Sequence, residues 1–82
     1  MREEEILQGI TRVAREHLGW TGPLAAEMRL VEELRLDSLG LLTLAVEVEN
    51  LFRVRLDEED EAEIETVEDL VSAVKRKRPG GG

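Results

Sequence analysis

Ser38 is the residue whose type and position most suggest chemistry, because it follows Asp37 at the expected start of a helix. A nucleophilic serine needs a base, and the sequence contains one histidine, His17. In a Ser38–His17–Asp37 triad, the adjacent Asp and Ser would have to lie on opposite sides of one imidazole, which the geometry disfavours. The local run Leu-Asp-Ser-Leu-Gly also lacks the Gly-x-Ser-x-Gly turn of serine hydrolases. We therefore interpret the chain as a non-enzyme and Ser38 as an acceptor.

The acidic run Asp57–Glu65 raises the question of a calcium site. An EF-hand loop needs spaced oxygen ligands and a glycine at its sixth position, and the sixth residue of this run is Ala62. The sequence has no cysteine, which excludes disulfides, thiolate nucleophiles and zinc sites built on sulfur. We expect no metal site, and we interpret the run as a solvated acidic helix.

Composition indicates a small acidic protein. Its 82 residues suffice for one domain with a small core, and its net charge is −8. Such a surface repels nucleic acid and anionic lipid and favours encounter with basic protein surfaces. No apolar run approaches the roughly 20 residues that span a bilayer, and the N-terminal residues are too acidic for a signal peptide. We expect a cytoplasmic monomer without nucleic-acid binding or membrane insertion.

Apolar spacing predicts an all-α fold, a small bundle of three longer helices and one short helix. The first helix is expected from about Arg2 to His17, before Gly19. A long loop follows over residues 19–36, with a helical turn near Ala25. Its expected apolar anchors are Leu30, Val31 and Leu34.

The second helix is expected to begin at Asp37-Ser38, where either side chain can cap the free N–H groups, and to end near Phe52. After a bend, a short acidic helix carries Leu56 and Ile64. Thr66 then caps a last helix with an apolar stripe. The stripe consists of Val67, Leu70, Val71 and Val74.

The basic run Lys75–Arg78 follows this stripe and precedes Pro-Gly-Gly-Gly. Four charges in this position more often mark a solvated tail than a nuclear-import signal. We therefore expect one domain over residues 1–78 and a flexible tail over residues 79–82.

The helix expected up to Phe52 is apolar over more of its surface than one buried face needs. With Leu39 at zero and 100° per residue, its core face spans about 120° to 240°. That face contains Leu41, Leu44, Ala45, Val48, Leu51 and Phe52. Leu39, Leu42 and Val46 form a second strip between about 300° and 360°, beside Ser38. Either the helix is central and buries both strips, or this second strip, here called the docking strip, is partly exposed as an interaction site.

The stretch LRLDSLGLLTLAVEVENLF resembles the acyl carrier protein family, in which Asp-Ser-Leu opens the second helix. The resemblance covers nearly the whole chain, including LVEELRLDSL, LFRVRL and the acidic DEEDEAEIETVEDLV. It implies that Ser38 accepts 4′-phosphopantetheine covalently from coenzyme A through a separate phosphopantetheinyl transferase. The N–H groups and positive dipole end at a helix start would favour the resulting phosphodiester anion.

The resemblance also implies roles for the neighbours of Ser38. Asp37 caps the helix or helps to position the modifying enzyme. The docking strip matches the family's apolar partner contacts, and Glu47 and Glu49 remain as acids along the helix. The implied partners are acyl-loading, elongating or transferring enzymes with basic docking patches.

The pathway is expected to be fatty acid synthesis or specialised polyketide or lipid biosynthesis. Gly40 and Thr43 stand where carriers of fatty acid synthesis commonly have further acids, which favours a specialised pathway. The core is aliphatic with Ala45 at its centre, and such packing could part to admit a fatty chain. Trp20, the only tryptophan, is expected to cover one end of the core.

A second hypothesis comes from another class of function. The chain could be an unmodified helical adaptor of carrier-like fold that binds a partner through the docking strip. Replacing Ser38 by alanine separates the two hypotheses, because a carrier would lose all activity and an adaptor would still bind.

Overall fold

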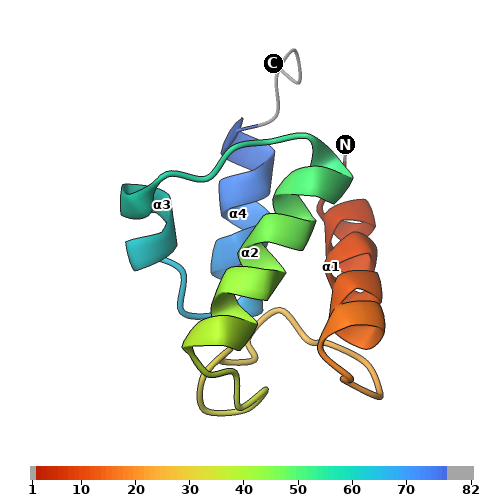
Figure 1. The fold of residues 1–82 in the computed structure, drawn as a ribbon. Coiled ribbons are helices and arrows are strands. Elements are labelled where there is room, and N and C mark those ends of the chain that lie inside the picture. The colour runs from red at the N-terminus through yellow and green to blue at the C-terminus, as the bar shows by residue number, and fades with distance from the viewer. Residues whose placement is uncertain (1, 78–82) are drawn as a thin grey trace.

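The computed structural model describes residues 2–77, which fold into four helices around one core (Figure 1). The helices are α1 (Glu3–His17), α2 (Ser38–Phe52), α3 (Glu58–Ala62) and α4 (Val67–Lys77). Within this range there is no strand, and one isolated bridge joins Arg29 to Thr66. The prediction of an all-α bundle with three longer helices and one short helix is confirmed. None of the described helices is long and apolar enough to cross a membrane.

α1 forms because its apolar residues recur on one face and its charges suit the helix dipole. Acidic residues occupy the first turn, and Arg15 and His17 lie in the last turn. Its buried residues are Ile6, Ile10, Val13 and Ala14. Gly19 has a φ of 71°, a left-handed conformation that favours glycine, and it ends the helix where the sequence predicted.

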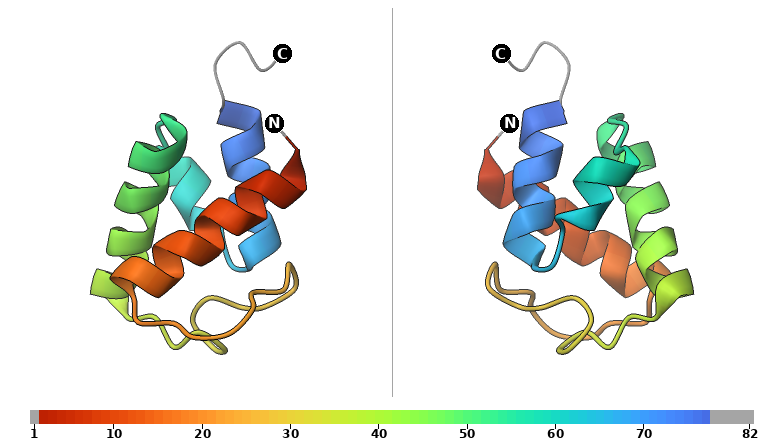
Figure 2. Two further views of the ribbon diagram at one scale, coloured as in Figure 1. Left: turned by 90° about the vertical axis from the view of Figure 1, so that its right-hand side faces the viewer. Right: turned by 90° about the vertical axis from the view of Figure 1, so that its left-hand side faces the viewer.

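α1 packs against both α2 and α4, and Figure 2 shows it lying diagonally across them. The crossing with α2 is close at Gly9. A Cβ atom added to Gly9 would lie 2.3 Å from Phe52 Cζ and 3.1 Å from Leu51 Cδ2. The two helices can therefore approach at this point because residue 9 has no side chain.

The connection over residues 18–37 crosses the end of the bundle at which α2 begins (Figures 1 and 2). A turn is present near Ala25, as predicted, and in it Met28 N–H donates a hydrogen bond to the Ala25 carbonyl. The buried residues of the connection are Leu24, Leu30 and Leu34. Half-buried Trp20 also packs against the core, as expected.

Val31 was predicted to anchor this connection, and that prediction is wrong, since its side chain is 53% exposed. Residues 29–34 form a turn in which Glu33 and Leu34 N–H donate to the Arg29 carbonyl. A helical turn places residues four apart on the same side, so Leu30 and Leu34 both face the core and Val31 faces solvent.

α2 buries a narrower face than the sequence predicted. Leu44, Val48 and Phe52 are buried, whereas Leu51 is 42% exposed and does not belong to the core. Leu51 lies at one edge of the predicted core face, next to the crossing with α1, and α1 covers only part of its side chain. The expectation that Ala45 is central is also wrong, since Ala45 is partly exposed.

α3 is shorter than predicted, so Leu56 precedes it and Ile64 follows it. The cause is a capping box in which Asp57 and Asp60 exchange hydrogen bonds between side chains and backbone N–H groups. Leu56 is nevertheless buried, and Ile64 is half-buried against the core.

α4 begins as predicted, because Thr66 Oγ1 accepts a hydrogen bond from Asp69 N–H at 3.1 Å. All four residues of the predicted apolar stripe are buried, and Ala73 joins them. The basic residues Lys75 to Lys77 belong to the last turn of this helix, where they complement the dipole.

The basic run was predicted to be a solvated tail. Lys75 and Arg76 are indeed exposed, but Lys75, Arg76 and Lys77 belong to α4 and form ion pairs, so they are not a tail. Arg76 Nη2 and Lys77 Nζ each lie 3.0 Å from a carboxylate oxygen of Asp60. Lys75 Nζ lies 3.8 Å from a carboxylate oxygen of Glu3. Arg78 and the tail predicted over residues 79–82 lie outside the described residues.

Candidate functional site

The N-terminus of α2 is capped by Asp37, which leaves the next residue available. Asp37 Oδ1 accepts a hydrogen bond from Gly40 N–H at 2.7 Å, and Asp37 itself has extended backbone angles. Ser38 is the first residue of the helix, its side chain is exposed, and its hydroxyl forms no hydrogen bond within residues 2–77. Of the two predicted capping residues, only Asp37 takes that role, so the Ser38 hydroxyl is accessible to a reagent.

The position of Ser38 at a helix N-terminus favours a negatively charged group attached to its hydroxyl. The residue lies at the N-terminal end of a 15-residue helix, where unpaired N–H groups and the dipole provide positive charge. The first turn within α2 contains no acidic side chain, although the carboxylate of Asp37 at the N-cap partly opposes this effect. A phosphodiester attached to Ser38 would therefore be stabilised electrostatically.

His17 lies too far along the bundle to activate Ser38. Its Nε2 atom is 3.4 Å from Glu47 Oε1, a contact that joins the end of α1 to α2. Glu47 follows Ser38 by nine residues, which is about 13 Å along the helix axis. The histidine of the described residues is therefore placed away from Ser38. Residues 2–77 also contain no cluster of three acidic or histidine side chains that could hold a metal ion.

The docking strip is exposed beside this serine. Leu39 is 69% exposed, Leu42 is 56% exposed and Val46 is 40% exposed. Of the two arrangements left open by the helical wheel, the structure has the one in which only the other face of α2 is buried. Three neighbouring exposed apolar side chains of this kind are typical of an interaction surface.

Glu47 and Glu49, predicted to contact partners, both have partners within the chain. Glu47 contacts His17, as described above. Glu49 Oε2 accepts a hydrogen bond from Leu56 N–H at 2.7 Å, which fixes the segment between α2 and α3. These two residues are the only acids within α2, so apolar side chains dominate the surface around the docking strip.

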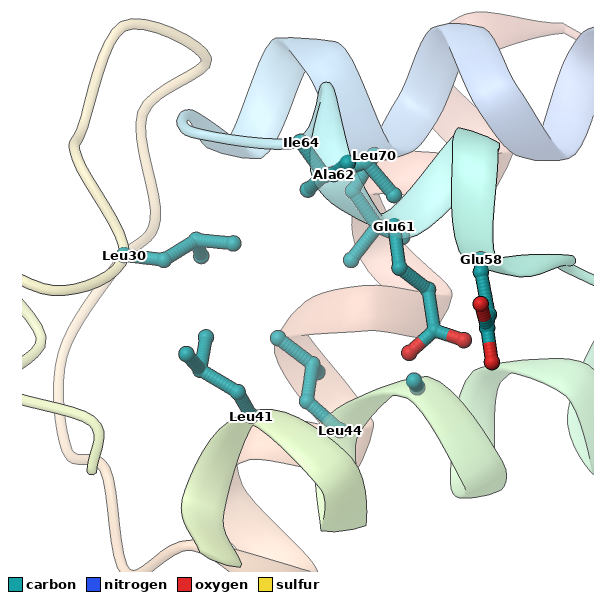
Figure 3. Close-up of a pocket in the computed structure, with 9 residues that line it drawn as sticks. Leu30, Leu41, Leu44, Glu58, Glu61, Ala62, Ile64 and Leu70 are labelled. Atoms are coloured by element: carbon teal, nitrogen blue, oxygen red, sulfur yellow. The ribbon is translucent and has the colours of Figure 1, made fainter. Parts of the chain in front are cut away.

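A pocket of about 340 Å³ opens between α2 and α3 (Figure 3). Its lining consists of Leu30, Leu41, Leu44, Ala45, Glu58, Glu61, Ala62, Ile64 and Leu70. The sequence suggested that the aliphatic core could open to admit a fatty chain, but it did not predict that a pocket is already present. On the α2 side of the opening, Leu41 and the small residue Ala45 are partly exposed and Leu44 is buried.

One wall of this pocket, α3, is fastened to α4 through Asp60, whose side chain is nearly buried. Hydrogen bonds from Asp57 N–H, then Lys77, then Arg76, hold the pKa of the Asp60 carboxyl well below its ordinary value. The same contact with Asp60, assisted by Asp57, raises the pKa of Lys77. The ion pairs therefore help to fix the position of α3 relative to the rest of the bundle.

Comparison with known proteins assigns this arrangement to a family. Residues 4–74 match the family described as phosphopantetheine attachment site. An acyl carrier protein of Kineococcus radiotolerans is 33% identical over 75 residues, which cover 90% of this chain and 93% of the relative. An acyl carrier protein of Thermotoga maritima is 35% identical, with the same coverage of 90% and 93%.

The similarity extends to a solved structure, described as an acyl carrier protein from Mycobacterium tuberculosis. The TM-score is 0.70 at 34% identity, and the match covers 90% of this chain and 95% of the other. The chain belongs to the phosphopantetheine attachment-site family, which confirms the resemblance found in the sequence.

Proposed function

We propose that this protein is an acyl carrier, which holds acyl intermediates as thioesters on a 4′-phosphopantetheine arm attached to Ser38. The observation that carries the proposal is the accessible Ser38 hydroxyl at the start of α2, next to a cap supplied by Asp37. Membership of the phosphopantetheine attachment-site family supports the identity of the arm. The names of the relatives support an acyl cargo.

The attachment step is assigned to a separate phosphopantetheinyl transferase, because His17 contacts Glu47 and lies away from Ser38. The serine oxygen forms a bond to the phosphorus of the phosphopantetheinyl group, and coenzyme A loses adenosine 3′,5′-bisphosphate. The transferase takes the serine proton. The thiol of the arm then carries the acyl group, and the protein itself performs no catalysis.

Partner enzymes are proposed to contact the docking strip. Its three exposed apolar side chains can be buried by a partner, and burial of this kind supplies most of the affinity in small interfaces. The net charge of −8 attracts enzymes with basic docking patches during encounter. The carrier is proposed to act as a cytoplasmic monomer that loading, elongating and transferring enzymes visit in turn.

The proposed pathway is fatty acid biosynthesis or a specialised polyketide or lipid pathway. Gly40 and Thr43 leave the first turns of α2 without acidic side chains, and the two acids further along have internal partners. Partner recognition on α2 therefore depends on apolar contact more than on charge. The pocket between α2 and α3 offers an apolar space for the acyl group of the loaded carrier.

An unmodified adaptor is the alternative, and the exposed docking strip is the observation that favours it. The two functions differ in whether Ser38 is needed. Ser38→Ala would abolish a carrier's activity while its fold remains, whereas an adaptor with this substitution would bind its partner with unchanged affinity.

The test of the carrier function is modification of the purified protein. The chain is incubated with coenzyme A and a broad-specificity phosphopantetheinyl transferase, and its intact mass is measured. We expect the mass to increase by one phosphopantetheinyl group. No increase in a folded protein, while an unrelated carrier is modified in parallel, would favour the adaptor.

A further inference from the structure

The pocket between α2 and α3 has two chemically different ends (Figure 3). Leu30 and Leu41 line one end, whereas Glu58 and Glu61 of α3 lie toward the other. The two glutamates are three residues apart, so they share one face of the short helix. Figure 3 shows both side chains extending from α3 toward α2. The pocket is therefore apolar at one end and bordered by carboxylates at the other.

The charges of Glu58 and Glu61 are not neutralised by the cations near α3. Arg76 and Lys77 instead pair with Asp60, and Lys77 also lies 3.6 Å from Asp57. Among the ion pairs of residues 2–77, none involves either of the two pocket glutamates. This end of the pocket consequently has a negative potential, which is felt more strongly beside apolar walls than in bulk water.

The position of Ser38 determines which end of a bound chain meets these charges. Along α2, Leu41 lies about 4.5 Å beyond Ser38, and Ala45 lies about 10 Å beyond it. An acyl group that enters from the Ser38 side passes Leu41 first. Its distal end then lies nearest Ala45, Glu58 and Glu61.

We propose that Glu58 and Glu61 select the acyl cargo, so that the pocket takes acyl chains with an uncharged distal end and rejects chains that end in a carboxylate. This inference rests on the proposed attachment of the arm to Ser38. A distal carboxylate would lose water at an apolar wall and face two like charges, and both effects disfavour its ionised form inside the pocket. A distal methyl group instead gains apolar burial against side chains such as Leu44 and Ile64.

The test compares two eight-carbon cargoes that differ only at the distal end. The protein is loaded from octanoyl coenzyme A or suberyl coenzyme A by the transferase, and loading is verified by intact mass. Methyl NMR signals of Leu44 and Ile64 then report whether the chain occupies the pocket. We expect octanoyl to shift both signals at pH 7, and the suberyl form to dock on the order of tenfold less.

Variants of α3 identify the residues responsible. The double variant Glu58→Gln/Glu61→Gln should allow the suberyl chain to shift the Leu44 and Ile64 signals. The matched control Glu59→Gln/Glu63→Gln removes the same charge from exposed residues outside the pocket lining, and it should still exclude that chain. Should the double variant fail to fold, added salt replaces it. Because both pocket glutamates are exposed, screening should raise suberyl docking in the unmodified sequence and leave octanoyl docking unchanged.

Three results would overturn the inference. They are equal shifts from both cargoes, no shift from octanoyl, and equal suberyl docking in the two double variants. Failure of the proposed function has a different signature. In that case the mass shows no loading at all, before any NMR signal is considered.

Discussion

Asp37 and Gly40 are joined by a 2.7 Å hydrogen bond, in which Asp37 Oδ1 accepts from the backbone N–H of Gly40. The sequence allowed either Asp37 or Ser38 to cap α2, and this bond assigns the cap to the aspartate. A Cβ atom on residue 40 would lie 3.2 Å from the same oxygen, so glycine leaves room for the bond to be short. The consequence is an exposed serine hydroxyl at the first position of the helix.

Substitution of Asp37 separates its capping role from its charge. We expect Asp37→Ala to lower the free energy of unfolding by about 1 kcal/mol, because the N-cap is lost. Asp37→Asn keeps an oxygen acceptor and should stay within about 0.5 kcal/mol of the unmodified protein. Urea unfolding followed by Trp20 fluorescence measures both values. Equal destabilisation by the two variants would contradict a capping role.

The asparagine variant then has a second use. Because it is expected to retain the cap, a lower rate of phosphopantetheine transfer in Asp37→Asn would measure the contribution of the charge to transferase binding. An unchanged rate of transfer would show that the charge of Asp37 does not contribute and that its role is to cap the helix.

Gly9 should tolerate no side chain, because a Cβ atom there would lie 2.3 Å from Phe52 Cζ. Alanine favours a helix over glycine by about 1 kcal/mol. Overpacking at the crossing of α1 and α2 outweighs this gain, and we expect Gly9→Ala to lower the free energy of unfolding by about 1–2 kcal/mol. Gln8→Ala, at the exposed neighbouring position, is the control and should change it by less than about 0.5 kcal/mol. A stabilised Gly9→Ala variant would show that the helices are not in close contact.

Leu42 and Leu44 lie two residues apart on α2, and truncation should affect partner activity at Leu42 and stability at Leu44. Leu44 is 3% exposed, so Leu44→Ala should cost about 2–5 kcal/mol of stability. Exposed Leu42 contributes little to the core, and Leu42→Ala should change stability by less than about 1 kcal/mol. If the docking strip contacts partners, this second variant should lower kcat/KM for at least one partner enzyme by about tenfold. Full activity with the transferase and every acyl-transferring partner would count against the docking role.

The sequence predicted the ends of α1 and α2 to within one residue, because apolar period, caps and glycine are local signals. It did not predict which side chains a neighbouring helix covers. Leu51 was placed in the core from its angle on α2, yet its side chain is 42% exposed. The basic run was treated as a tail because its partners, Asp60 and Glu3, are distant in sequence.

Some features of the candidate site are predicted by local sequence patterns, and others depend on how the helices pack. A helical wheel separates the docking strip from the core face of α2, and a capping motif places Ser38 at the start of the helix. Exposure of the strip and the pocket beside α3 depend on where α1, α3 and α4 pack, which no local pattern contains. Glu49 is an example. Its side chain accepts a hydrogen bond from Leu56 N–H across a bend, and the sequence predicted the bend but not this contact.

Asp60 should make stability depend on pH in the acidic range. The pKa of Asp60 is lower in the folded chain than in the unfolded one, so its ionised form stabilises the fold above its unfolded pKa, near 3.9. That contribution is lost as the pH falls below about 4, toward the lower folded value. Asp60→Asn should therefore have a lower Tm at pH 7, and the difference from the unmodified protein should shrink at pH 3.

The matched control for this titration is Glu63→Gln, which removes an exposed carboxylate at the C-terminal end of α3. Its Tm should differ little from that of the unmodified protein at either pH. A difference between Asp60→Asn and the unmodified protein that stays constant from pH 7 to pH 3 would contradict the assigned role of Asp60.

The central claim is attachment of phosphopantetheine to Ser38, and site-resolved mass spectrometry tests it most directly. Ser72 is the only other serine of the sequence, so Ser38→Ala and Ser72→Ala form a matched pair. After incubation with coenzyme A and transferase, the unmodified chain and Ser72→Ala should each gain one phosphopantetheinyl group on the peptide that contains residue 38. Ser38→Ala should gain none while keeping its fold. Addition that persists in Ser38→Ala, or no addition to the folded unmodified chain beside an active control, would contradict the claim.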